Sequence, residues 1–281
     1  METRILCLLF LSALVFLDSA SVYTLSSELE LIDAVKKGNI KKIINILKHD
    51  TNKTLLNHAS SFMNWTPLMW ACSIPESNST AYLIKAGADL NSRAVDGKTP
   101  LIVASVHGSV GAIQALIAHR NIDINARDKD GYSAIHRAVT SENFPIIRQL
   151  LIAGADADLS TNRGYGALHI AAGTGQLHIL KFLIKHKVDV NKRAFDGDTP
   201  LLIACTAADA NIVSELVLAG ASVNIRGSVG LTAIIRACMS RCTECVNVLI
   251  AAKADLSLIS DSGNSFSSSK FCSDMKSHTT Q

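Results

Sequence analysis

A three-residue pattern recurs at nearly constant spacing through most of this chain. It opens with Thr, Ser or Gly, continues with Pro or Ala and closes with Leu or Ile, and it starts at positions 66, 99, 133, 166, 199 and 232. The steps between starts are 33, 34, 33, 33 and 33 residues, and an Ala stands five residues after each start. A fixed period of this length is typical of repeat arrays, in which each unit buries its apolar face against its neighbours. We therefore expect a stack of copies of one small unit.

The residue types within one period indicate a turn followed by two helices. Thr at the start can cap a helix by accepting a backbone N–H bond, and the following Pro suits the first helical turn, as in Thr66-Pro67. Gly87, Gly154 and Gly220 follow apolar runs and are expected to end helices in the left-handed conformation. Asp-Gly dipeptides such as Asp96-Gly97 favour a tight reversal between units.

These residues resemble ankyrin repeats, in which a T-P-L-H-x-A signature follows a G-A-D-V-N pattern; here Gly87–Asn91 reads G-A-D-L-N. The resemblance covers residues 28 to about 257. It implies an all-α fold, an ankyrin-repeat solenoid of helix-turn-helix units joined by β-turn or hairpin loops. The signature His occurs only as His136 and His169, where it implies a hydrogen bond within the turn.

The register divides the chain into a leader, a repeat domain and a tail. About seven units are expected in the domain 26–257, at 26–62, 63–95, 96–129, 130–162, 163–195, 196–228 and 229–257. Ser27 and Glu30 form a capping-box pattern that predicts the start of the first helix. Residues 258–281 are expected to form a degenerate cap and a Ser-rich disordered tail, because Lys270 stands where other units bury an Ala.

Residues 1–20 have the composition of a secretory signal peptide. One basic side chain, Arg4, precedes an uncharged run over 5–17, and small residues follow. The run is shorter than the about 20 apolar residues that span a bilayer. Asp18 is unfavourable three residues before a cut after Ala20, so an uncleaved anchor and a cytosolic N-terminus remain alternatives. We expect a secreted or secretory-pathway protein, with a cytoplasmic one as the alternative.

The resemblance also implies where a partner binds. Binding in the family commonly uses the turn tips and the exposed edge of the first helices, and aromatic side chains dominate interface energies. By register, the predicted partner-binding residues are Phe62, Trp65, Lys98, Tyr132, Tyr165, Phe195 and Leu231. The rings of Trp65, Tyr132, Tyr165 and Phe195 are the predicted anchors. The alternative is that each ring packs on its own turn.

Two rows of polar residues keep the same register. Arg93, Arg127, Arg193 and Arg226 form a basic row, for which we favour a role in solubility over binding to an acidic surface or to lipid headgroups. A second row is expected to satisfy backbone groups in the turns; it comprises Asn91, Asn125, Asn191 and Asn224.

The seven cysteines allow several readings. Cys72, Cys205 and Cys238 follow the recurring Ala and are expected to be small core residues. Cys242 and Cys245 form a CxxC, for which a zinc site, a Cys242–Cys245 disulfide and a Cys242–Cys272 disulfide remain alternatives to free core thiols. The prediction is that no metal is bound.

Three Asn-x-Thr sequons lie near the N-terminal end, at Asn52, Asn64 and Asn78. In a eukaryotic secretory pathway we expect glycans on Asn52 and Asn78. Asn64 is less suited, because Thr66 is needed as a helix cap.

The sequence favours a binding function over catalysis. It contains no P-loop, GxSxG or HExxH, so we expect no enzyme, no catalytic residue and no cofactor. A net charge of +3 without a dense basic block argues against nucleic acid. The expected function is a monomeric protein-binding module, secreted or in the secretory pathway, with an unidentified protein partner and no integral membrane span after leader removal. Because ankyrin repeats resemble parts of exported effectors and toxins, a host-interacting factor is one form of this hypothesis. The alternatives are an intracellular scaffold or adaptor, and a membrane-anchored regulator with residues 5–17 uncleaved.

Overall fold

A computed structural model of the chain describes residues 19–50, 54–60, 63–267 and 272. The predicted leader up to position 18, Asn52 and Phe62 lie outside these residues. The chain divides into two compact units, Met1–Asp123 and Ile124–Gln281. The described residues of both units are built from paired helices.

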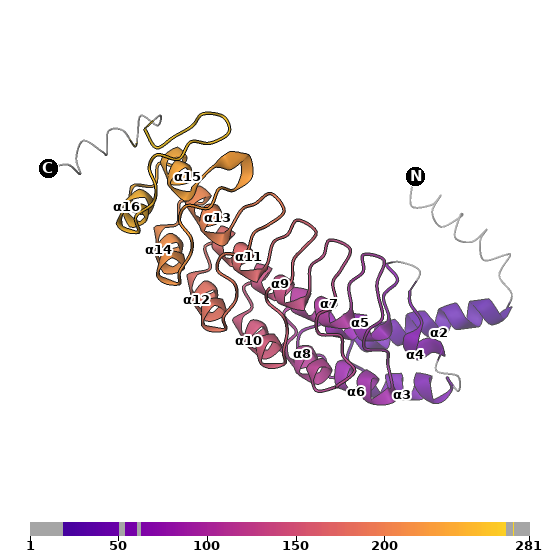
Figure 1. Ribbon diagram of the computed structural model, residues 1–281. Helices are drawn as coiled ribbons and strands as arrows, with labels where there is room; N and C mark the ends of the chain where they lie inside the picture. The colour runs from indigo at the N-terminus through magenta and orange to yellow at the C-terminus, as the bar shows by residue number, and fades with distance from the viewer. Residues whose placement is uncertain (1–18, 51–53, 61–62, 268–271, 273–281) are drawn as a thin grey trace. The chain divides into compact units, whose positions relative to one another are not determined.

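The described residues of unit 1 form three helix pairs and one short extra helix (Figure 1). The first helices of the pairs are α2 (Ser19–Lys36), α5 (Pro67–Cys72) and α7 (Pro100–His107), which lie side by side in that order. The second helices are α3 (Ile40–Lys48), α6 (Ser79–Ala86) and α8 (Val110–Ile117). Helix α4 (Thr54–Asn57) packs against α2 and α5, and the Asp50 carboxylate caps it by accepting the backbone N–H groups of residues 54 to 56.

The first helix begins earlier than the capping-box pattern predicted. Helix α2 is continuous from Ser19, so Ser27 lies inside it and caps nothing. The predicted start at this point is therefore wrong. The segment before Ser27 contains neither Pro nor Gly, so nothing in it ends a helix, and a capping pattern alone does not start one.

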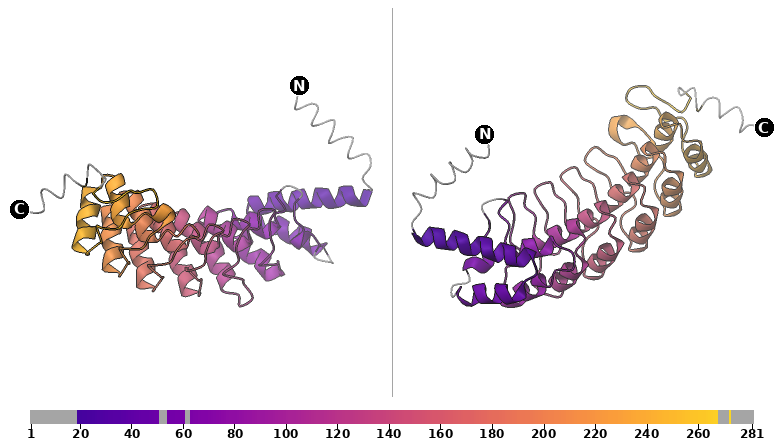
Figure 2. Two further views of the ribbon diagram at one scale, coloured as in Figure 1. Left: turned by 45° about the horizontal axis from the view of Figure 1, so that its top comes forward. Right: turned by 180° about the vertical axis from the view of Figure 1, so that it is seen from behind.

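In the part of unit 2 that the structure describes, four helix pairs lie in two rows (Figures 1 and 2). The row of first helices is α9 (Ala134–Thr140), α11 (Ala167–Gly173), α13 (Pro200–Thr206) and α15 (Ala233–Met239), and each contacts the next. The row of second helices is α10 (Phe144–Ile152), α12 (Leu177–Lys185), α14 (Ala210–Leu218) and α16 (Thr243–Ala251). One short 3-10 turn, η1 (Ser228–Gly230), lies in the loop before α15.

Most first-helix starts have a side-chain cap, by Thr as predicted or by His, but Thr232 makes no such bond. At Thr199 the side-chain hydroxyl accepts the Leu202 N–H, and Pro200 occupies the first turn. Where the chain has Gly166 instead of Thr, the cap comes from His169, whose Nδ1 accepts the Gly166 N–H at 3.1 Å. His136 caps at Ser133 in the same way. The signature His therefore makes the predicted turn hydrogen bond.

The row of asparagines links successive units through the backbone. Each side-chain oxygen accepts an N–H about one repeat later: Asn91 from Asp123, Asn125 from Asp156, Asn191 from Ser222 and Asn224 from Asp255, at 2.7–2.9 Å. The predicted structural role of these residues is confirmed. In the repeat between those of Asn125 and Asn191, Asp158 stands at the equivalent place, and its carboxylate accepts the Asp189 N–H.

The loops between helix pairs form narrow fingers that contact one another edge to edge. We call the loops 127–133, 160–166, 193–199, 226–232 and 259–265 the fingers of unit 2. Backbone bonds join neighbouring tips, with Asn162 N donating to Asp130 O and Phe195 N donating to Arg163 O at 3.0 and 3.1 Å. Gly164, with φ +85°, permits this approach, since a Cβ there would lie 2.4 Å from Phe195 N. The fingers thus support each other as a row.

The core of each pair is aliphatic, and the last unit is closed by a shorter segment. Phe266 is 1% exposed and Cys272 is fully buried, although the surrounding sequence is rich in Ser. Cys272 forms a disulfide with Cys238 on α15. The buried Phe266 and the Cys238–Cys272 disulfide thus close the last described helix pair, α15 and α16.

An apolar hollow as candidate functional site

Unit 2 has a hollow of about 450 Å³ on the face where the first helices meet the fingers. Its floor comes from α11, α13 and α15, and its rim comes from the fingers that precede α11 and α13. The lining residues are Tyr165, His169, Ile170, Gly173, Thr174, Asp198, Ile203, Thr206, Ala207 and Arg236. Most of the exposed lining is apolar, which is typical of a site for apolar side chains.

The hollow exists because Gly173 lacks a side chain near two isoleucines of the floor. Ile170 and Ile203 lie four residues after their unit starts and are half-buried on the floor. Gly173 has no side chain, and a Cβ there would approach the Ile203 Cγ2 to 3.2 Å. Any larger residue at position 173 would therefore fill the space between the two isoleucines.

An ion pair forms one wall of the hollow. The Arg236 guanidinium contacts both oxygens of the Asp198 carboxylate, at 2.6 and 2.8 Å, and the Thr206 hydroxyl at 3.1 Å. The two side chains are only 11% and 9% exposed. Because the charges neutralise each other, the wall presents no net charge to an incoming group.

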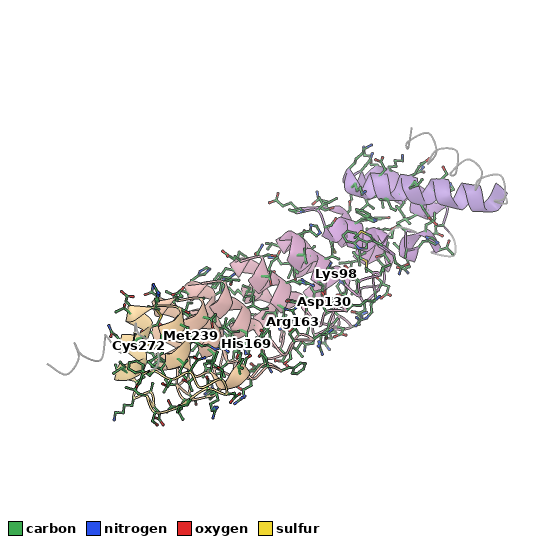
Figure 3. All side chains as sticks on the ribbon, turned by 90° about the horizontal axis from the view of Figure 1, so that it is seen from above. Lys98, Asp130, Arg163, His169, Met239 and Cys272 are labelled. Carbon is green, nitrogen blue, oxygen red and sulfur yellow. A yellow bond between two sulfur atoms is a disulfide. The ribbon has the colours of Figure 1, made fainter. Side chains whose placement is uncertain are left out.

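Two further polar groups at the rim are also neutral. The Tyr165 hydroxyl donates to the Asp196 carboxylate at 3.3 Å, and burial together with this carboxylate raises the pKa of the Tyr165 phenol. Burial lowers the pKa of His169, which caps α11 and whose Nε2 lies 3.2 Å from Asp198 O (Figure 3). The lining of the hollow is thus mostly apolar, and its two charged side chains, Arg236 and Asp198, are paired with each other.

The predicted partner-binding residues of unit 2 differ in their surroundings and exposure. Tyr165 lines the hollow. Phe195, at the tip of the next finger, is 78% exposed. Tyr132 is half-buried, with the Arg137 guanidinium 4.1 Å from its ring centre, and Leu231 is half-buried at its finger base. Tyr165 and Phe195 therefore lie on adjacent fingers, and of the two only Tyr165 lines the hollow.

In unit 1 the prediction of an exposed ring at Trp65 is wrong. Trp65 is 8% exposed and packs against Trp70 and His107, with ring centres at 4.8 and 6.3 Å. Its ring packs against side chains of α5 and α7 and not on its own turn. Lys98 is half-buried and pairs with Asp96 at 2.6 Å. Phe62 lies outside the described residues.

Sequence reasoning missed the floor of the hollow. It followed the finger residues and passed over Ile170, Ile203 and Arg236, each four residues after a unit start. The available signal was the type of residue four positions after each unit start. This residue lies one helical turn after the cap, on the side of the helix that faces the fingers. The effect of Gly173 depends on packing and had no sequence signal beyond its identity.

The basic row is occupied within the fold. Arg127 binds Gly131 O and the Asn162 side chain, and Arg193 binds Arg226 O at 2.9 Å. Arg226 binds the Asp261 carboxylate at 2.8 Å, and Arg93 binds Gly97 O within its own finger. In unit 2 the guanidinium groups of Arg127, Arg193 and Arg226 thus each join one finger to the next, a role more specific than solubility.

The cysteine pairing differs in part from the alternatives considered. Cys242 is joined to Cys245, while Cys272 is joined to Cys238 and not to Cys242. Cys238 therefore lies in the core, as expected, but as half of a disulfide. Cys72 and Cys205 are buried free thiols, and burial raises the pKa of both.

The described ranges show no group of three or more His, Cys, Asp or Glu residues arranged to hold a metal ion. None of the helices in those same ranges is long and apolar enough to cross a bilayer.

Comparison with known families decides the class of this fold. The family described as ankyrin repeats (3 copies) matches residues 31–128, 112–194, 135–227 and 168–260, which together span most of the chain. The chain belongs to the ankyrin repeat family. This family is a repeat module and not a class of enzymes, and the all-helical paired-helix array agrees with the expected fold.

Solved and curated ankyrin proteins resemble the chain to different extents. The crystal structure of the ankyrin repeat domain of Bcl-3, a member of the IkappaB protein family, has a TM-score of 0.71 and 25% identity, covering 79% of this chain and 97% of that one. Alpha-latrocrustotoxin-Lt1a of Latrodectus tredecimguttatus is 28% identical over 125 residues, which are 44% of this chain and 9% of the toxin. Neurogenic locus notch homolog protein 1 of Homo sapiens is 38% identical over 102 residues, which are 36% of this chain and 4% of that protein. The matched stretch is thus a small part of both curated relatives.

Proposed function

We propose that this ankyrin module works in the secretory pathway or outside the cell and binds a partner protein at the hollow of unit 2. The partner inserts an uncharged apolar side chain between Ile170 and Ile203. The observation that carries the proposal is the mostly apolar hollow of about 450 Å³ with the half-buried Tyr165 ring in its lining. Aromatic and aliphatic groups that surround a hollow are the usual centre of a protein interface.

The neutral wall supports an apolar anchor over a charged one. Arg236 is already paired with Asp198, so an acidic side chain from a partner would have to displace a partly buried carboxylate. The finger that carries Tyr165 is joined to the next by the bond from Phe195 N to Arg163 O at 3.1 Å, and the restricted movement of this finger lowers the entropy lost on binding.

The disulfides support a secretory location. Cys238–Cys272 and Cys242–Cys245 pair four of the cysteines that follow the leader. Disulfides persist in oxidising compartments and are rare in the cytosol, where thiols are kept reduced. The leader-like composition of residues 1–20 points to the same compartment.

The location is tested by expressing the full chain with a C-terminal tag in cultured animal cells. Recovery from the medium with a mature start near Ala20 to Val22, and with four oxidised cysteines, is the expected result. An intact Met1 in the cytosol with free thiols would refute secretion and favour an intracellular scaffold.

The binding site is tested separately, by a photo-reactive residue placed at position 203. Its crosslinked partner is identified and then titrated against the unmodified chain. Gly173→Leu should weaken this binding at least about tenfold by filling the hollow. A matched substitution at the 79% exposed Leu218, Leu218→Ala, should leave it unchanged. Equal affinities for all three proteins would refute the site.

A further inference from the structure

Two buried residues of α6, Ser79 and Thr80, are polar where other second helices are mostly aliphatic, and the Ser79 hydroxyl donates to Val35 O at 3.2 Å. Thr80 lies 14 residues after its unit start, and the equivalent residues in the other units are Ile113, Ile147, Leu180, Val213 and Val246. All five are fully buried aliphatic side chains, and Thr80 is also buried, at 2% exposure. A hydroxyl therefore occupies a position that the other units fill with hydrocarbon.

The fold gives this hydroxyl only a weak partner. Thr80 Oγ1 is buried without an oxygen or nitrogen partner, which costs free energy in a folded protein. It interacts with the Cys72 thiol, but burial outweighs this contact and raises the pKa of that thiol, and a neutral thiol is a weak hydrogen-bonding group. A Val at position 80 would have the same shape without the penalty.

The other two sequon threonines differ in this respect. Thr54 Oγ1 donates to the Asp50 carboxylate at 2.9 Å, where it helps to cap α4. Thr66 Oγ1 accepts the Met69 N–H as the cap of α5. Both hydroxyls have strong partners in the fold, whereas that of Thr80 has only a weak one.

The three sequon asparagines differ as well. Asn78 precedes α6, is exposed, and makes no capping hydrogen bond with its side chain. Asn64 has φ +56°, and its Nδ2 donates to Arg93 O at 3.1 Å. This bond links the loop before α5 to the loop before α7. Asn52 lies outside the described residues. Of the two described asparagines, Asn78 alone has a side chain that a sugar can extend from without breaking a bond of the fold.

We propose that Asn78 carries an N-linked glycan and that Thr80 is retained for the transfer reaction and not for the fold. The inference rests on the proposed secretory location. In the transfer, Asn78 Nδ2 forms a bond to C1 of a lipid-diphosphate-linked oligosaccharide. The C1–O bond to the diphosphate breaks, the lipid diphosphate leaves with the electron pair, and one Nδ2 proton passes to a base of the transferase.

The burial of Thr80 also fixes when the transfer happens. A sequon hydroxyl that is 2% exposed is out of reach of an enzyme once unit 1 has folded. The glycan is therefore added before α6 packs. In the folded unit Asn78 lies in the turn between α5 and α6, at the opposite end of α5 from the loop that precedes it, so the glycan leaves that loop uncovered.

The test uses the full chain with its own leader in cultured animal cells. Protein from the medium is treated with peptide N-glycosidase in heavy-oxygen water, and the tagged residue is located by peptide mass spectrometry. We expect a tag at Asn78 that Thr80→Val abolishes and Thr80→Ser, which keeps the sequon, preserves. Asn64→Gln is the control and should not change the tag at Asn78.

A second measurement separates a role in transfer from a role in folding. The same Thr80→Val variant, made without glycans in bacteria, should melt about 2–4 °C higher than the parent chain, since it removes a buried hydroxyl that has only a weak partner. A lower melting temperature would mean that the hydroxyl serves the fold and would overturn the inference. Secreted protein with an untagged Asn78 would overturn it too. A chain that stays in the cytosol without any glycan refutes the secretion proposal and this inference with it, and the location readout distinguishes that case.

Discussion

Arg236 and Asp198 form a bidentate ion pair between α15 and the finger that precedes α13, with nitrogen–oxygen distances of 2.6 and 2.8 Å across 38 residues of sequence. Both side chains are nearly buried. The Asp198 carboxylate also accepts the Ser228 N–H at 2.8 Å, so it joins successive fingers. The wall of the hollow is therefore also a structural tie within unit 2.

Removing one partner of this pair should destabilise the protein strongly. Arg236→Met leaves a buried carboxylate without its counter-charge, and we expect a loss of about 3 kcal/mol in the free energy of unfolding, measured by urea denaturation. The control is Arg226→Met, which breaks the exposed pair with Asp261 and should cost at most about 1 kcal/mol. Similar losses for both variants would contradict the structural role of the Arg236 pair.

The Cys238–Cys272 disulfide should stabilise the end of unit 2 more than the CxxC disulfide does. It closes a loop with a sequence separation of 34 residues, and chain-entropy arguments give about 4 kcal/mol for such a loop. Cys272→Ser should lower the denaturation midpoint by a corresponding amount under non-reducing conditions. The double variant Cys242→Ser, Cys245→Ser opens a loop with a separation of only 3 and should lose clearly less. The opposite order would show that loop closure is not what stabilises this end.

His136 should make the protein sensitive to mild acid. Its Nδ1 accepts the Ser133 N–H, and burial lowers its pKa to about 4, below the value of about 6.5 in an unfolded chain. Between these values the unfolded state binds the extra proton, so the stabilisation is complete above pH ~6.5 and is lost as the pH falls towards 4. We expect a loss of about 3 kcal/mol at pH 4.

The check is the pH dependence of urea unfolding in His136→Gln, where Gln can still cap the helix start. This variant should show a shallower decrease between pH 6.5 and 4 than the parent. His186→Gln, at an exposed position, serves as the control. A parent chain that keeps its stability down to pH 4 would contradict a neutral, buried His136.

The repeat architecture was predictable because it depends on local, periodic signals. The Thr-Pro starts, the left-handed Gly87, Gly154 and Gly220, and the asparagine links all occupy the predicted places, since each acts within one unit or on the next. The start of α2 was not, because a capping pattern at Ser27 starts a helix only where the preceding segment is interrupted, and that segment contains no Pro or Gly.

The site was predictable only in part, because it depends on which faces pack together. The finger register located Tyr165 and Phe195 but could not distinguish them from Trp65, whose ring is covered by Trp70 in a different local packing. The hollow arises from a missing side chain at Gly173, and the Cys238–Cys272 bond depends on how the last segment folds back. Both are tertiary effects without a periodic signal.

The central claim is that the hollow of unit 2 binds an apolar group of a partner protein. The most direct measurement is a calorimetric titration of the partner identified through position 203 against the parent chain, Gly173→Leu and Ile203→Asp. The account predicts a negative heat-capacity change for the parent and at least about tenfold weaker binding for both variants, with thermal stability within a few degrees of the parent for Gly173→Leu. Unchanged affinity for a folded Gly173→Leu protein would contradict it.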